Sequence, residues 1–207
     1  ISPLIKNSFS KIKPKLIRNN NNKFRVIYAG NIGEGQSIYQ LILNLNKDLK
    51  TIKRMKKNNI IFEIYGSGSQ VKDLKNLLYL NCNILGKVVR YCGLVNKKEI
   101  NNIYKRADCL MLHLSNVKSI DCVIPSKIFE YASTNLPILF GASGYTYKFI
   151  NDIEGTVPFK QLDSKSFYEG IINSMKLKIS KEKRTEFISD YLTSDIYKKY
   201  ALHILKS

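Results

Sequence analysis

The sequence has no tryptophan, only two histidines and only four cysteines. The cysteines, Cys82, Cys92, Cys109 and Cys122, stand far apart, with no paired spacing and no histidine cluster beside them. This pattern argues against a zinc site and against a disulfide framework, and it favours a reducing compartment such as the cytoplasm. We therefore expect no metal site, and we expect these cysteines to act as small buried hydrophobic side chains.

Long apolar runs are also missing. No run approaches the roughly 20 residues that a helix needs to cross a bilayer. The first residues lack both a methionine and the apolar core of a secretory signal. We expect a chain without a membrane-spanning helix that starts inside a longer protein.

Acidic residues are scarce, because 16 Asp and Glu oppose 34 Lys and Arg and leave a net charge of +18. Such a charge fits nucleic acid, an anionic membrane surface or phosphate-bearing substrates. No RNA-binding aromatic signature and no Cys/His finger accompanies it, so we expect no nucleic-acid partner. Our first interpretation is a solvated basic surface on helix faces, and peripheral contact with an anionic membrane is the second. The clearest such face is predicted to carry Lys47, Lys50, Lys53, Arg54, Lys56 and Lys57.

What is present is an alternation of strands and helices. β-Branched and aromatic runs predict strands at 24–29, 59–65, 88–92, 108–114, 136–140 and 156–159. Apolar residues at helical spacing predict one helix from Ile38 through Leu49 and others at 71–78, 100–104 and 167–175. This order requires a mostly parallel, doubly wound, Rossmann-like α/β sheet over residues 24–180. Residues 1–23 are expected to form a linker, and residues 181–207 a helical tail.

Glycine turns follow three of these strands. They are Gly30-x-x-Gly33, Gly66-x-Gly68 and Gly93. A glycine turn between a strand and a helix lets the backbone approach a phosphate closely, although the first spacing is neither the dinucleotide fingerprint nor a P-loop. Because ligands of parallel sheets bind beyond the carboxyl ends of the strands, these turns are expected to meet at one edge.

A proline-led helix start, Pro125-Ser126-Lys127 with Glu130 one turn later, is expected at the same edge. Proline suits this position, and the free amides of Ser126 and Lys127 would favour an anion there. Lys127 adds a positive charge, and the Glu130 carboxylate can accept hydrogen bonds from two neighbouring hydroxyls. A diphosphate beside a ribose would satisfy all of these groups.

Four segments together resemble a known family. Residues 28–36, 65–68, 91–95 and 125–139 resemble, in the same order, the donor-binding motifs of the retaining GT-B glycosyltransferases of the glycosyl transferases group 1 family. The similarity covers about residues 24–175 and is greatest to capsule and O-antigen enzymes that act on UDP-N-acetyl sugars. It implies the C-terminal half of a GT-B fold, with the N-terminal, acceptor-binding domain missing from this chain.

The resemblance also implies roles. Glu130 would hold the ribose hydroxyls, Ser126 and the loop amides the diphosphate, and Lys127 would supply the counter-charge. Gly93 and Leu94 would face the base. The sugar would leave as an oxocarbenium-like species with retention of configuration, without an essential metal, and would pass to a glycan or lipid-linked acceptor in surface polysaccharide synthesis. The implied donor-binding residues are Gly30, Asn31, Gly33, Gly66, Gly93, Leu94, Ser126, Lys127 and Glu130.

The chain departs from the family pattern at two places. Many members carry Glu-x7-Glu across the donor helix start, but here the first position is Cys122, with Asp121 beside it. Many also have Arg and Lys in the first glycine loop, where this chain has Asn31, Glu34 and Gln36. Lys127 is expected to compensate in part for the missing cations.

Two other classes of function stay open. One is a sugar-nucleotide epimerase of the same architecture, although no group of His, Asp or Glu residues in the sequence favours it. The other is a non-catalytic nucleotide-binding module, or a basic nucleic-acid protein, that uses the same sheet. His113 and His203, the only histidines, are not predicted to be catalytic bases: His113 is expected to be structural and His203 exposed.

Overall fold

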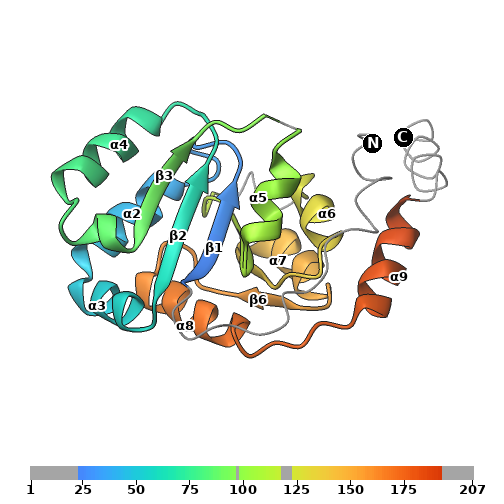
Figure 1. Cartoon of the computed structure of the whole chain (residues 1–207). Coiled ribbons are helices and arrows are strands. Elements are labelled where there is room, and N and C mark those ends of the chain that lie inside the picture. The colour runs from blue at the N-terminus through green and yellow to red at the C-terminus, as the bar shows by residue number, and fades with distance from the viewer. Residues whose placement is uncertain (1–22, 97, 118–122, 193–207) are drawn as a thin grey trace.

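The computed structural model describes residues 23–96, 98–117 and 123–192 and shows one sheet covered by helices on both faces (Figure 1). Within those residues, no helix combines the length and the apolar content of a bilayer-spanning segment. All strand pairs are parallel, and the strand order is β3-β2-β1-β4-β5-β6. The predicted doubly wound, Rossmann-like α/β fold is therefore confirmed. The strands are β1 Phe24–Ala29, β2 Ile60–Tyr65, β3 Val89–Gly93, β4 Cys109–His113, β5 Ile138–Gly141 and β6 Thr156–Pro158.

Two apolar cores lie on opposite faces of this sheet. Both contain fully buried strand residues, as expected for strands covered on both sides. The first core is formed with α2 Ile38–Lys47, α3 Leu49–Lys57, α4 Val71–Leu80, the 3₁₀ turn η1 Leu85–Lys87 and α8 Ser164–Ser174. The second is formed with α5 Ile100–Arg106, α6 Lys127–Ala132, α7 Gly144–Asn151 and α9 Lys181–Leu192.

The single helix predicted from Ile38 through Leu49 is wrong, because the chain breaks at Asp48. The Asp48 carboxylate accepts a hydrogen bond from the Thr51 amide at 3.0 Å, and it thereby caps the start of α3. Leu49, which we placed on the apolar face, is 50% exposed. Helix α7 was not predicted at all. Its N-cap is Ser143, a residue type that favours this position, although the side chain makes no cap hydrogen bond.

A carboxylate lies inside the otherwise apolar strand β2. Glu63 is buried, and its oxygens lie 3.6 Å from the guanidinium nitrogens of Arg25 and of Arg106. The Tyr65 hydroxyl donates to the same carboxylate at 3.0 Å. Burial of a charge is tolerable only with partners of this kind, so the network fixes Tyr65 at the carboxyl end of the strand.

The cysteine prediction is only partly right. Cys109 is buried in β4, but Cys82 and Cys92 are free and exposed. Cys92 lies in β3, an edge strand of the sheet, and Cys82 lies in the connection between α4 and η1. Cys122, Asp121, His203 and most of the predicted linker and tail lie outside the described residues.

Candidate functional site

Strand order places the predicted turns at one crevice. The chain reverses direction of winding between β1 and β4, and in such sheets this switch point is where ligands bind. Gly30 follows β1, Gly66 follows β2, and Lys127 opens the helix that follows β4. The prediction that these segments meet at a single edge is confirmed.

The first two glycine turns are locked together by backbone contacts. The Gly30 amide donates to the Tyr65 carbonyl at 3.0 Å, and the Ile32 amide to the Ser67 carbonyl at 2.8 Å. Gly66 has a φ of +138°, and a Cβ there would lie 1.8 Å from the Gly30 carbonyl oxygen. Glycine is therefore needed at Gly66 so that one loop can seat against the other, in addition to any approach to a ligand.

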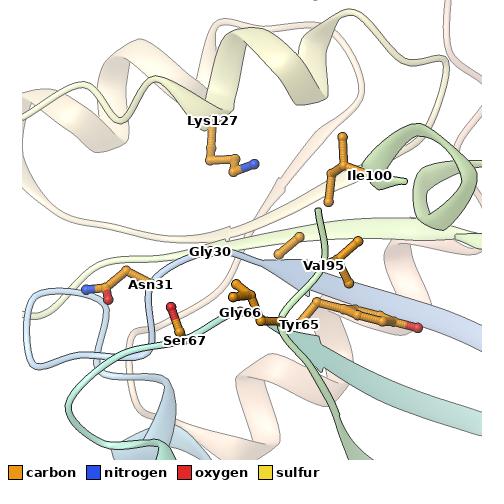
Figure 2. A pocket seen from close by; sticks show the side chains of 10 residues that line it. Gly30, Asn31, Tyr65, Gly66, Ser67, Val95, Ile100 and Lys127 are labelled. Atoms are coloured by element: carbon orange, nitrogen blue, oxygen red, sulfur yellow. The ribbon is translucent and has the colours of Figure 1, made fainter. Parts of the chain in front are cut away.

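A cavity of ≈ 240 Å³ opens at this crevice (Figure 2). Figure 2 shows Asn31 and Ser67 on one side, Val95 and Ile100 on the other, and Lys127 reaching in from α6. The cavity thus has a polar end and an apolar end, which suits a ligand with a charged part and a planar ring. Its lining residues are Ala29, Gly30, Asn31, Tyr65, Gly66, Ser67, Leu94, Val95, Ile100 and Lys127.

Lys127 is the one charged residue in that lining. Its Nζ donates to Glu130 Oε2 at 2.9 Å and to the Tyr104 hydroxyl at 3.3 Å. The Tyr104 hydroxyl donates to the same Glu130 oxygen at 3.2 Å. Burial raises the pKa of Tyr104, helped by the nearby Tyr131 and Glu130, so this hydroxyl stays protonated and remains a donor.

The predicted donor-binding residues divide into two groups. Gly30, Asn31, Gly66, Leu94 and Lys127 line the cavity. The remaining four do not line it, and they are placed in different ways. Glu130 reaches the cavity through Lys127, Gly93 directly precedes Leu94, Gly33 is buried within its loop, and Ser126 is exposed at the start of α6.

Sequence reasoning missed several residues of the site. Ser67 and Tyr65 belong to a predicted turn and strand, but they were not assigned to a ligand. The sequence pattern predicts Tyr104 only as part of an apolar helix face. Its signal was the hydroxyl, because a buried tyrosine usually needs a polar partner.

His113 is structural, as predicted. It is 1% exposed at the end of β4, and its ring stacks on Phe159. Nδ1 donates to the Gln36 carbonyl at 2.7 Å, while Nε2 accepts from the Leu162 amide at 3.4 Å. The imidazole is therefore neutral and ties the first glycine loop to the segment after β6.

This burial makes stability depend on pH. Burial lowers the pKa of His113 to about 4 from its ordinary 6.5. Between these values the unfolded chain binds a proton that the folded chain does not, so stability is full above pH 6.5 and falls as the pH drops toward 4. The loss is at most about 3 kcal/mol. Urea unfolding at pH 7 and pH 5 checks it, and His113→Gln should show a shallower pH dependence. An equal dependence in both proteins would contradict this role.

A second hollow, of ≈ 340 Å³, lies on the outer face of α3. It is lined by Lys50, Lys53, Arg54 and Lys57. The expected basic helix face is therefore present in part as a shallow basin. Its contact with an anionic membrane stays a prediction.

Several solved structures share this fold. The lipopolysaccharide outer core galactosyltransferase WaaB, in its apo form, has a TM-score of 0.63 at 13% identity, over 91% of this chain and 51% of its own. Anabaena Alr3699/HepE in complex with UDP has a TM-score of 0.63 at 12% identity, over 89% and 49%. The pneumococcal O-GlcNAc transferase GtfA, in complex with UDP and GlcNAc, has a TM-score of 0.58 at 14% identity, over 88% and 35%.

The chain spans about half the length of the first of these proteins. No match was found among curated proteins. The family model described as glycosyl transferases group 1 matches residues 9–190, beginning inside the segment expected to be a linker. With this match over most of its length, and with the GT-B neighbours of its fold, the chain belongs to the glycosyl transferases group 1 family.

Proposed function

We propose that this chain is the donor-binding half of a retaining GT-B glycosyltransferase that transfers a sugar from a UDP-sugar, with a UDP-N-acetyl sugar as the favoured donor. The observation that carries the proposal is the two-ended cavity at the switch point, with Lys127 as its charged residue. Two of the neighbouring structures contain UDP, which supports the choice of nucleotide. The acceptor is proposed to be a glycan or lipid-linked glycan of a surface polysaccharide, and the enzyme to act in the cytoplasm.

The two ends of the cavity would hold different parts of the nucleotide. The base would lie toward Val95 and Ile100, and Leu94, which is 71% exposed, would cover it from the rim. The diphosphate would lie between the Gly30 loop and Lys127. The ribose would then come close to Glu130, whose carboxylate exchanges its present partners for the ribose hydroxyls.

Charge stabilisation of the leaving diphosphate is the proposed source of catalysis. As the glycosidic bond breaks, negative charge grows on the diphosphate and positive charge on the sugar. Lys127 is placed at the cavity before the reaction, so it stabilises the growing negative charge with little reorganisation. This route needs no metal for the step, and we expect nucleotide binding without one.

Calorimetry of the 207-residue chain with UDP and with uridine tests the proposal. We expect UDP to bind at least about tenfold more tightly than uridine, because only UDP reaches Lys127 with charged oxygens. Binding should persist with excess EDTA. A basic nucleic-acid module would instead bind polyanions, lose them steeply with added salt and ignore UDP. Absence of UDP binding would overturn the proposal.

Contact with an anionic membrane is a separate part of the proposal. The basin on α3 supports it, because Lys50, Lys53 and Lys57 are exposed there beside the half-buried Arg54. Sedimentation with vesicles of anionic or of neutral lipid tests it, and equal binding to both would contradict it.

A further inference from the structure

Helix α9 places a cation deep inside the domain. Arg184 is 2% exposed and is the largest fully buried side chain among the described residues. Its guanidinium donates to the carbonyls of Thr134 at 3.0 Å and Leu136 at 3.2 Å, and its Nε donates to the Glu154 carbonyl. Longer bonds of 3.4 Å reach the carbonyls of Tyr131 and Ala132. The group is thus held by backbone oxygens drawn from three neighbouring segments.

Most of these oxygens belong to the end of α6 and the turn that follows it. The last carbonyls of a helix have no partner within the helix, and they carry its partial negative charge. Tyr131 O already accepts from the Thr134 amide and hydroxyl, so within α6 itself Arg184 adds a second donor to Tyr131 and a donor to Ala132, and its shorter bonds hold the turn that follows. It also places a compensating positive charge at this helix end. Burial lowers the pKa of Arg184 to about 10, so the guanidinium remains charged at neutral pH.

The surroundings are shaped for this guanidinium. Gly155 has a φ of +74°, and a Cβ there would lie 2.9 Å from Arg184 Nη2. One turn along α9, Phe187 stacks on Phe129 of α6 with ring centroids 6.4 Å apart, and Ile188 is buried beside it. Because of helical spacing, one face of α9 packs against α6; it carries Arg184, Phe187 and Ile188.

The contacts continue from α6 to the first glycine loop. Tyr131, whose carbonyl Arg184 contacts, is 1% exposed. Its hydroxyl lies 3.3 Å from the Ala29 amide and 3.4 Å from the Ala29 carbonyl, directly before Gly30. α6 is only six residues long, about 9 Å, so a tilt at its capped end moves Lys127 at the other.

We propose that Arg184 is a positioning residue of the donor site: by capping α6 from α9, it sets where Lys127 and Glu130 meet the nucleotide. The inference rests on the proposed function, and it makes the C-terminal helix a determinant of donor affinity although α9 lines no part of the cavity.

Calorimetry with Arg184→Met and Arg184→Lys tests this role. We expect Arg184→Met to weaken UDP binding about tenfold, which is about 1.4 kcal/mol, and Arg184→Lys to weaken it less, because a single ammonium keeps the charge but not the fork of donors. Phe167→Leu is the matched control, since Phe167 is a fully buried residue of α8 in the other core. It should lower the melting temperature but change UDP affinity by less than about twofold.

A double-mutant cycle separates positioning from general destabilisation. If Arg184 acts through α6, the loss caused by Arg184→Met shrinks when Lys127 is already alanine, because the group being positioned is gone. Fully additive losses would overturn the inference, as would UDP affinity unchanged in both Arg184 variants. If Arg184→Met does not fold, the same double-mutant cycle with Lys127→Ala is measured with Arg184→Lys and with Phe187→Leu. If the unmodified chain fails to bind UDP, that result alone rejects the proposed function. Failure of the present inference is distinct, because it appears only in the Arg184 variants of a chain that does bind UDP.

Discussion

Replacing Glu130 with alanine is expected to abolish UDP binding, with a loss of more than about a hundredfold, while the fold survives. In the proposed site the carboxylate accepts hydrogen bonds from both ribose hydroxyls, and each such charge-assisted bond contributes about 1.5–3 kcal/mol. Its side chain is 34% exposed, so removing its pair with Lys127 costs the fold little. Calorimetry with UDP and a thermal melt of the same variant measure the two effects.

Uridine provides the internal check on Glu130. Since the ribose is common to both ligands, Glu130→Ala should weaken uridine and UDP by similar factors. Glu130→Gln keeps an acceptor oxygen but loses the charge. Its affinity for UDP should lie between the affinities of the unmodified chain and of Glu130→Ala. Glu169→Ala is the matched control, because Glu169 is exposed on α8, on the other face of the sheet. Unchanged UDP affinity in Glu130→Ala refutes the assignment.

Replacing Lys127 with alanine should weaken UDP about thirtyfold, or about 2 kcal/mol, and uridine by less than about twofold. The reason is that Lys127 is the sole charged residue in the cavity lining, so nothing else there can replace its contact with the diphosphate. Calorimetry with both ligands measures the difference between the two losses.

Lys53→Ala is the control for Lys127, because it removes the same charge from the exposed face of α3. UDP affinity should stay within about twofold of the unmodified chain. Equal losses of UDP and uridine in Lys127→Ala would show that the lysine supports the fold of the site and not the phosphates. A comparable loss in Lys53→Ala would point to the net charge of the chain as the cause.

The fold was predictable because its signals are local. A run such as 60–65 favours a strand wherever it occurs, and alternation with helices then requires a parallel sheet. The break between α2 and α3 was hidden, because Leu45 and Leu49 continue the helical spacing across Asp48. Only the tertiary placement of Leu49 at the surface shows that the pattern had ended.

The candidate site was predictable only as a set of chain segments. Parallel strands oblige the turns after Ala29 and Tyr65 to meet, but which side chains enter the cavity depends on the local backbone. The partners of Glu130 and α6 are remote: Tyr104 lies 26 positions from Glu130, and Arg184 lies 50 from Thr134. In a chain with 34 Lys and Arg, nothing in the sequence marks Arg184 as the buried one.

The junction between β1 and β4 has a mechanical consequence. The register pairs six residues of β1 with β2, but only Val26 with Cys109 and Ile27 with Leu110 across to β4. The pairing with β4 is therefore the shorter of the two pairings of β1. The cavity lies across this junction, with Gly30 after β1 on one side and Lys127 after β4 on the other. A nucleotide bound there would contact both sides of the β1–β4 junction. Donor binding would therefore also stabilise the sheet against separation of these two strands.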